Sequence, residues 1–179
     1  FETDTYASAT DNIDGISKRT KVRYRWYGST SCGDMSNGAL EFKRKRNNVG
    51  WKEKFPVVLQ EGACFHYPDL IRNIRQSLPL KRQIEFTYYN LPFILNRYNR
   101  KYYSTEDNKI RVTLDSAISA FDQRWCLDMN NRKKITLPCL IIVEFKFAVQ
   151  DKERAVQLMK RFPFRISKHS KYITSLLHI

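Results

Sequence analysis

The sequence contains none of the glycine-rich motifs with which many proteins bind phosphate through the backbone. It has no G-x-x-x-x-G-K-[ST] loop and no G-x-G-x-x-G turn, and only 6 of its 179 residues are glycine. Both motifs place phosphate groups against backbone amides at the start of a helix. Their absence means that any phosphate binding by this chain would depend on side chains.

Acidic residues are scarce relative to basic ones. The chain has 32 Lys and Arg residues against 18 Asp and Glu residues, which leaves a formal net charge of +14. A surplus of this size carries no information about the fold, but it favours an anionic partner. The candidates are nucleic acid, an anionic membrane surface and phosphorylated small molecules.

Paired cysteines and long apolar runs are also missing. No two of the cysteines, at positions 32, 64, 126 and 139, have C-x-x-C spacing, so they do not resemble a metal-binding or redox pair. We expect reduced thiols in a cytoplasmic protein. The longest apolar run, 137–143, falls far short of the roughly 20 residues that a membrane helix needs, and we expect no membrane span.

Several segments alternate between apolar and charged residues with period two, which is typical of half-buried strands. The pattern predicts strands at Lys21–Trp26, Leu40–Lys45, Ile110–Asp115 and Val143–Phe147. We predict further strands at Lys52–Leu59, Ile84–Thr87 and Ile94–Tyr103. Polar loops are expected at Gly28–Gly38, Asn47–Gly50 and Asp128–Lys134.

Helices are expected at only a few places. One follows Pro68, has Leu70 and Ile74 on its apolar face and ends at Pro79. A second begins at Asp151 and ends before Pro163, and a short third helix is expected at Ser170–Leu177. Because few helices separate the strands, we expect an α+β fold with an antiparallel sheet.

The polar faces of the predicted strands carry an unusual number of bases. The sets are Lys21/Arg23/Arg25, Glu41/Lys43/Lys45, Arg111/Asp115 and Glu144/Lys146. A bound polyanion would offset the repulsion among these bases if the faces converge, and closure of the sheet would give a basic tunnel. A solvated sheet face on a nucleic-acid-binding protein explains the alternation about as well.

A resemblance to a known family favours the tunnel. The stretches that carry it run in order along nearly the whole chain: 12–28, which ends in Arg23-Tyr-Arg-Trp-Tyr-Gly28, then Leu40–Lys45, Lys52–Lys54, Arg97–Tyr103, Ile110–Asp115, Val143–Lys146 and Ser170–Tyr172. In this order they resemble the VTC domain, the polyphosphate polymerase domain of the triphosphate tunnel metalloenzyme (CYTH-like) superfamily. The resemblance implies one domain over residues 1–179, an antiparallel β-barrel with a few flanking helices.

The resemblance also implies roles for individual residues. The phosphate-binding bases of the family fall on Arg23, Arg25, Lys43, Lys54, Arg100, Arg111 and Lys171, and the metal-binding glutamate falls on Glu144. From the strand faces we add Lys146 as a further substrate-binding residue and Glu41 as a second metal ligand. Arg97 or Lys101 would replace Arg100 if the strand register slipped by one residue, and Lys52 is the alternative to Lys54. We expect Asp115 to anchor a loop or to pair with a base.

The family has an earlier strand with another phosphate-binding lysine, and this sequence begins after that strand. We therefore expect the barrel to lack its first strand here, as in an N-terminally truncated domain. The resemblance implies transfer of the terminal phosphate of ATP to polyphosphate with Mn²⁺ or Mg²⁺. Hydrolysis of tripolyphosphate or of a nucleoside triphosphate is the first alternative. A non-catalytic module that binds polyphosphate or RNA is the second, although nucleic acid is the less favoured partner.

Overall fold

The structure is a computed structural model that describes residues 1–47, 49–60, 64–167 and 169–179, apart from the side chain of Cys32. The chain divides into two compact units. Unit 1 consists of Phe1–Leu95 and Phe121–Lys134, and unit 2 consists of Asn96–Ala120 and Ile135–Ile179. Strand β4 (Ile94–Ser104) carries the chain from unit 1 into unit 2, and β5 (Ile110–Asp122) carries it back.

Unit 1 is built on a three-stranded antiparallel sheet. Its strands are β1 (Lys18–Arg25), β2 (Ala39–Arg46) and β3 (Val49–Pro56), with β2 in the centre. These elements confirm three of the predicted strands, with ends that differ by a few residues. Because side chains alternate along a strand, Val22, Leu40 and Phe42 are buried on the apolar face of this sheet, and most of the bases lie on the other face.

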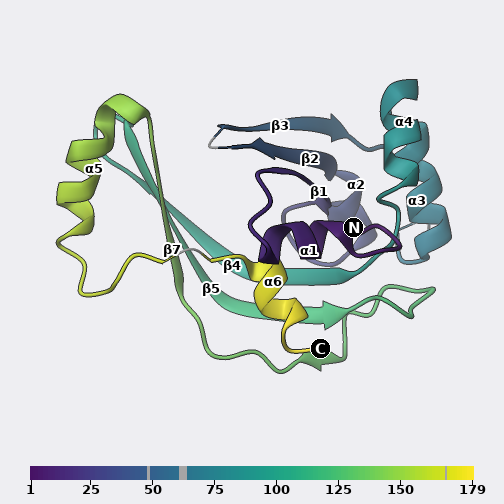
Figure 1. Ribbon diagram of the computed structural model, residues 1–179. Helices are drawn as coiled ribbons and strands as arrows, with labels where there is room; N and C mark the ends of the chain where they lie inside the picture. The colour runs from purple at the N-terminus through teal and green to yellow at the C-terminus, as the bar shows by residue number, and fades with distance from the viewer. Residues whose placement is uncertain (48, 61–63, 168) are drawn as a thin grey trace. The chain divides into compact units, whose positions relative to one another are not determined.

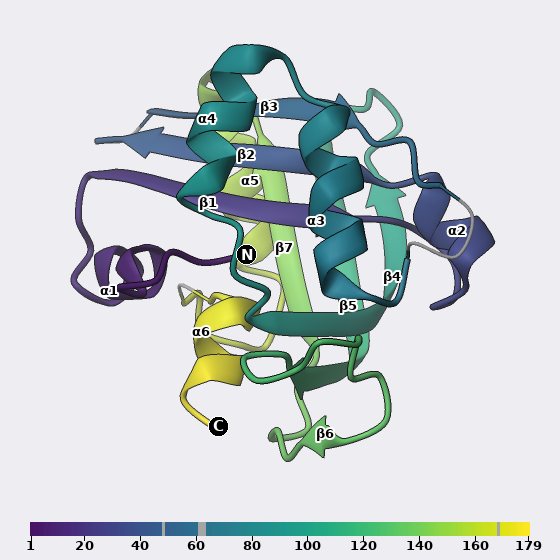
Figure 2. The ribbon, with the colours of Figure 1, turned by 90° about the vertical axis from the view of Figure 1, so that its right-hand side faces the viewer.

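Helices α3 (Tyr67–Gln76) and α4 (Leu80–Thr87) cover the apolar face of this sheet (Figure 2). Leu70 and Ile74 of α3 and Phe86 of α4 belong to the same buried cluster as Leu40 and Phe42. Full burial of each such side chain contributes about 1.5–3 kcal/mol to stability. The prediction of α3 with Pro68 in its first turn is confirmed.

The prediction of a strand at Ile84–Thr87 is wrong, because these residues form the second half of α4. Four residues are too few to separate a helical period from a strand period. Ion pairs also hold the helix against the sheet. Glu85 accepts two hydrogen bonds from Arg44 of β2 at 2.6 and 2.7 Å, and Arg82 lies 2.6 Å from Glu53 of β3.

Two short helices complete unit 1, and neither was predicted. Helix α1 spans Ala7–Ile13, and α2 (Cys32–Ser36) interrupts the segment Gly28–Gly38 that was expected to be a loop. The hydroxyl of Ser31 caps α2 by accepting a hydrogen bond from the Asp34 amide at 3.2 Å. A serine three residues before an acid is the sequence signal for such a start.

The cysteines are not all reduced. Cys64 is in a disulfide, which corrects the prediction for this residue, whereas Cys126 and Cys139 are free thiols. The side chain of Cys32 lies outside the description. Cys64 is buried among the apolar residues of unit 1.

Unit 2 contains most of a second antiparallel sheet (Figure 1). Its long central strand β5 pairs with β4, with the short β6 (Lys134–Ile135) and with β7 (Ile142–Phe147). A 3-10 turn, η1 (Val149–Asp151), leads from β7 into α5 (Lys152–Met159), and α6 (Lys171–Leu176) is the last helix. The predicted strands at Ile94–Tyr103, Ile110–Asp115 and Val143–Phe147 and the two predicted C-terminal helices are confirmed.

The fold class is therefore α+β with antiparallel sheets, as predicted. Across the described ranges, the strand pairings form two sheets and do not connect them into one closed barrel. None of the helices found there is both long enough and apolar enough to cross a bilayer.

Candidate phosphate-binding surfaces

The strand register of unit 1 gathers bases on the face of the sheet that α3 and α4 leave uncovered. Between β1 and β2, Lys21 lies opposite Lys43 and Arg23 lies opposite Glu41. Between β2 and β3, Lys43 lies opposite Lys52 and Glu41 lies opposite Lys54. We call this surface the basic face of unit 1, and its members are Arg19, Lys21, Arg23, Arg25, Glu41, Lys43, Lys45, Lys52 and Lys54.

Glu41 is the only acid of the basic face, and it is 2% exposed. Arg23 contacts it through Nε at 2.7 Å and Nη2 at 2.6 Å, and the Lys52 ammonium lies 3.7 Å away. Burial alone would raise the pKa of Glu41, but the charge and hydrogen bond of Arg23, with Lys52 and Arg25 nearby, hold it below its ordinary value. Glu41 therefore stays ionised and fixes the orientation of the Arg23 guanidinium.

Lys21 shows how crowded this face is. Burial, together with repulsion from Arg19 and Lys43, lowers the pKa of Lys21 to about 8, against a small opposing effect of Glu2. A lysine whose charged form is disfavoured in this way gains stabilisation from an anion placed beside it. Lys21 was part of the predicted alternation, but it was missing from the predicted site residues.

The other predicted bases of unit 1 differ in their surroundings. The guanidinium of Arg25 lies 4.5 Å from the centre of the Tyr27 ring, which is a cation–π contact. Lys43 and Lys54 have exposed side chains, and so does Lys52, the alternative to Lys54. The structure thus places Arg23, Arg25, Lys43 and Lys54 on one face of the same sheet.

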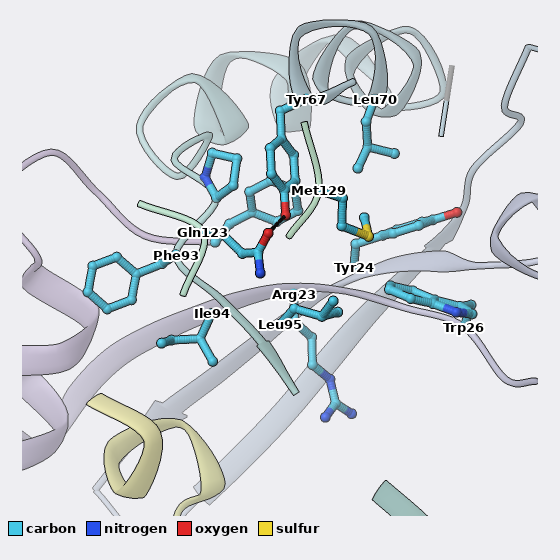
Figure 3. Close-up of a pocket in the computed structure, with 12 residues that line it drawn as sticks. Arg23, Tyr24, Trp26, Tyr67, Leu70, Phe93, Ile94, Leu95, Gln123 and Met129 are labelled. Atoms are coloured by element: carbon cyan, nitrogen blue, oxygen red, sulfur yellow. Dashed lines mark hydrogen bonds between the residues drawn. The ribbon is translucent and has the colours of Figure 1, made fainter. Parts of the chain in front are cut away.

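A small pocket of about 80 Å³ lies on the other side of β1, lined mainly by aromatic and aliphatic side chains (Figure 3). Within it, Tyr67 donates a hydrogen bond to Gln123 at 2.7 Å. Arg23 lines this pocket with its aliphatic stem, and its guanidinium points away from Tyr67 and Met129. The pocket is therefore mainly apolar in character, unlike the basic face of unit 1.

In unit 2, a buried carboxylate again organises the bases. Asp115 is 1% exposed and accepts hydrogen bonds from Nε and Nη2 of Arg100 at 2.5 and 2.7 Å. Lys171 of α6 forms a second ion pair with the same carboxylate. These two cations outweigh burial and hold the pKa of Asp115 below its ordinary value. The prediction that Asp115 pairs with a base is confirmed.

The structure also settles which base of β4 joins this cluster. Tyr98 and Arg100 project to the same face, where the Tyr98 ring lies 5.3 Å from the Arg100 guanidinium and 4.7 Å from the Lys171 ammonium. Arg97 and Lys101 are exposed, and they lie on the opposite face because side chains alternate along a strand. Arg100 is thus the base of β4 that lies beside Lys171.

Glu144 and its neighbours lie along the same sheet. The pairing of β5 with β7 sets Arg111 opposite Lys146 and Thr113 opposite Glu144. The Glu144 side chain is 45% exposed and forms two ion pairs, with Lys146 Nζ at 3.4 Å and Arg100 Nη2 at 3.9 Å. Arg111, Lys146, Glu144, Arg100 and Lys171 therefore belong to one surface, which we call the basic face of unit 2.

Three carboxylates are candidates for a bound cation, and they are not equivalent. Glu41 and Asp115 are buried and already hydrogen-bonded to bases, which favours an orienting role over coordination. No set of three or more His, Cys, Asp or Glu side chains within the described ranges is placed to hold a metal ion. Glu144 alone could offer an oxygen, and Mg²⁺ commonly takes one or two carboxylates with phosphate and water oxygens. A cation held here would therefore need phosphate and water oxygens in addition to Glu144.

Sequence reasoning missed one further residue of this surface. Thr113 is 6% exposed, and its hydroxyl has no hydrogen-bond partner among the described residues. It is on the same side of β5 as Arg111 and Asp115 and lies opposite Glu144. The alternation Arg111-Val-Thr113-Leu-Asp115 could have identified it, because alternate residues of a strand lie on the same face.

The features described so far define an antiparallel α+β protein whose sheets each present a face of clustered bases around a buried carboxylate. The sequence model of one family, the VTC domain, matches residues 1–179. The match covers the whole chain, and the chain belongs to the VTC domain family, which is associated with polyphosphate polymerases. A search of curated proteins finds no match.

Proposed function

We propose that the chain is a metal-dependent polyphosphate polymerase, which transfers the terminal phosphate of ATP to a growing polyphosphate chain. The observation that carries this proposal is the arrangement of like charges on the basic face of unit 1, where Lys21, Lys43 and Lys52 follow one another across three strands. Like charges placed side by side in this way repel one another, and a bound phosphate chain would offset the repulsion. The family to which the chain belongs points to the same substrates.

In this proposal, each unit contributes phosphate-binding bases. Arg23, Arg25, Lys43 and Lys54 would bind phosphate oxygens in unit 1, and Arg100, Arg111, Lys146 and Lys171 would do so in unit 2. Arginine offers a planar fork of donors that matches phosphate oxygens, and lysine offers a compact charge. Enclosure of the phosphates in a tunnel, as the family implies, is part of the proposal.

The proposed reaction needs no general base. A terminal phosphate oxygen of the acceptor chain attacks the γ-phosphorus of ATP and forms a new P–O bond. The bond between that phosphorus and the β–γ bridging oxygen breaks, and ADP leaves with the electron pair. The bases hold acceptor and donor in line and neutralise the charge that repels them. Glu41 and Asp115 do not contact the phosphates in this proposal. They fix the positions of Arg23, Arg100 and Lys171, which do.

Glu144 would hold the cation together with phosphate oxygens, and Mn²⁺ or Mg²⁺ in that position would neutralise charge on the transferred group. Glu41, the second ligand that the sequence suggested, is better suited to orient Arg23. A hydrolase of the same fold would need a carboxylate that orients water. Glu41 and Asp115 are each already paired with two bases, which favours phosphate over water as the acceptor.

The test is incubation of the purified protein with ATP and Mn²⁺, with long chains resolved on a gel and free phosphate measured in the same tube. We expect chains that require the metal. Arg25→Ala and Glu144→Gln should each reduce the rate roughly tenfold to a hundredfold, the effect of losing one charged contact. Arg72→Ala on α3, whose side chain is 65% exposed, and Glu106→Gln are the matched controls and should be active.

Free phosphate without chains would indicate the hydrolase. Salt-sensitive binding without either product would indicate a polyphosphate- or RNA-binding module.

A further inference from the structure

An open pocket of about 650 Å³ lies in unit 2, at the end of the β5–β7 ladder opposite to Asp115. Its lining includes Lys109, Arg111 and Lys146, two amide side chains (Asn108 and Gln150) and the carboxyl residue Asp151. The volume is within the range of about 300–1,000 Å³ that is typical of small-molecule sites. Only Arg111 and Lys146 have a role in the proposed reaction.

The pocket is held in shape by the turn between β4 and β5. Asp107 accepts hydrogen bonds from the Thr105 hydroxyl at 2.6 Å and from the Lys109 amide at 3.3 Å, and Arg154 of α5 forms an ion pair with the same carboxylate. These contacts tie the turn to α5. The 3-10 turn η1, which precedes α5, supplies the other wall of the pocket. Asn108 and Gln150 are thus presented from two elements that are clamped together.

The pocket is continuous with the basic face of unit 2. Lys146 lines the pocket and also lies 3.4 Å from Glu144, and its strand neighbour Arg111 lines the pocket as well. A triphosphate held at Glu144, Lys146 and Arg111 would therefore lead into the pocket with whatever group is attached to its far end.

The chemistry of the lining identifies that group. A bare phosphate chain offers only acceptor oxygens, so the Asp151 carboxylate would repel it and the amide oxygens of Asn108 and Gln150 would gain nothing. A nucleoside has both donors and acceptors. Its ribose hydroxyls can donate to a carboxylate, as they do in dinucleotide-binding folds, and the edge of its base can pair with an amide, which both donates and accepts.

We propose that this pocket is a nucleoside subsite, in which Asn108 and Gln150 bind the edge of the base, Asp151 accepts from the ribose and Lys109 joins Arg111 and Lys146 at the phosphates. The inference rests on the proposed function, because it takes a nucleoside triphosphate as the donor. The subsite gives the protein a preference for ATP over tripolyphosphate, which carries the same phosphates without the nucleoside.

The test compares ATP with tripolyphosphate as ligands in calorimetric titrations of the whole protein. Wild type should bind ATP more tightly. Gln150→Ala and Asp151→Asn should each weaken ATP binding roughly threefold to tenfold, the effect of one or two hydrogen bonds, and leave tripolyphosphate binding unchanged. Gln157→Ala on α5, whose side chain is exposed, is the control for Gln150→Ala. Because Asp151 precedes α5, Gln150→Ala decides the matter if Asp151→Asn does not fold.

Equal affinity of wild type for the two ligands would overturn the subsite, and so would unchanged ATP binding in Gln150→Ala and Asp151→Asn. If the two variants weakened only the binding of long polyphosphate chains, the subsite would also be overturned, because the pocket would then hold the product chain and not a nucleoside. The assay for chain synthesis is independent of these outcomes. ATP preference that depends on Gln150 without chain synthesis would support the subsite and reject the polymerase, whereas binding of neither ligand would reject both.

Discussion

Arg23 and Glu41 face each other across β1 and β2, and their side chains differ sharply in exposure, 37% for the arginine and 3% for the glutamate. The pair is therefore asymmetric. Removing the glutamate leaves a cation that water can solvate. Removing the arginine leaves a buried carboxylate compensated by Lys52 at 3.7 Å and by the charge of Arg25.

We expect Arg23→Ala to destabilise the protein by about 3 kcal/mol, as for a buried charge that loses its partner, and Glu41→Gln to cost roughly half as much. Urea unfolding of both variants measures the difference. The depressed pKa of Glu41 also means that the pair stabilises the protein at neutral pH and that this contribution disappears as the pH falls through the folded-state pKa. The free energy of unfolding should therefore fall less steeply with decreasing pH in Glu41→Gln than in wild type. A larger loss for Glu41→Gln than for Arg23→Ala would contradict this account.

The lowered pKa of Lys21 should make the free energy of unfolding depend on pH in the alkaline range. Its pKa of about 8 in the folded protein lies below the usual 10.4 of an unfolded chain. Between these two values the unfolded state binds more protons, so stability should rise with pH across this window. Lys21→Met should remove that rise and be more stable than wild type at pH 7. Lys81→Met, an exposed lysine on α4, is the control and should keep the wild-type profile.

The same lysine should take up a proton when a polyanion binds, since a nearby negative charge raises a lysine pKa. Calorimetric titration of tripolyphosphate at pH 8, repeated in buffers with different ionisation enthalpies, measures that uptake. We expect a substantial part of it to vanish in Lys21→Met. Proton uptake that is identical in the two proteins would show that the ligand does not bind beside Lys21.

Much of this surface could be predicted from the sequence, because a strand of alternating bases fixes which residues share a face. Arg23, Arg25 and Lys43 were assigned to the polar faces of their strands for that reason, whereas Lys54 came from the family resemblance. The ion pairs could not be predicted in the same way. Whether Glu41 coordinates a cation or orients Arg23 depends on burial, and burial depends on the neighbouring strands. The α4 segment was misassigned because its apolar run is short and its helical state depends on contacts with Arg44 and Glu53 of the sheet.

Asp115 is the residue that anchors the last helix, so its replacement should be costly. It binds Arg100 of β4 and Lys171 of α6 while almost fully buried. We expect Asp115→Asn to lower the free energy of unfolding by roughly 3–5 kcal/mol, because two partly buried cations lose their counter-ion. Hydrogen exchange should show α6 opening more often. As a matched comparison, Asp128→Asn removes a carboxylate that is 78% exposed beside His66, and it should cost little. Protection of α6 that is unchanged in Asp115→Asn would show that other contacts hold the helix.

Replacement of Thr113 should affect stability and activity in opposite directions. Its buried hydroxyl lacks a partner among the described residues, so its desolvation is uncompensated in the free protein. Thr113→Val keeps the shape and removes that cost, and we expect its free energy of unfolding to equal or exceed that of wild type. Because the hydroxyl lies opposite Glu144, we also expect chain synthesis to fall in Thr113→Val and to recover in Thr113→Ser.

Urea unfolding and the synthesis assay on the same preparations measure the two effects. The conservative serine variant controls for packing, since it retains the hydroxyl and loses the methyl group. A clear loss of stability in Thr113→Val would mean that the hydroxyl already has a partner in the free protein. Full activity in the more stable valine variant would show that the hydroxyl takes no part in the reaction, and the surface around Glu144 would then be limited to Arg100, Arg111, Lys146 and Lys171.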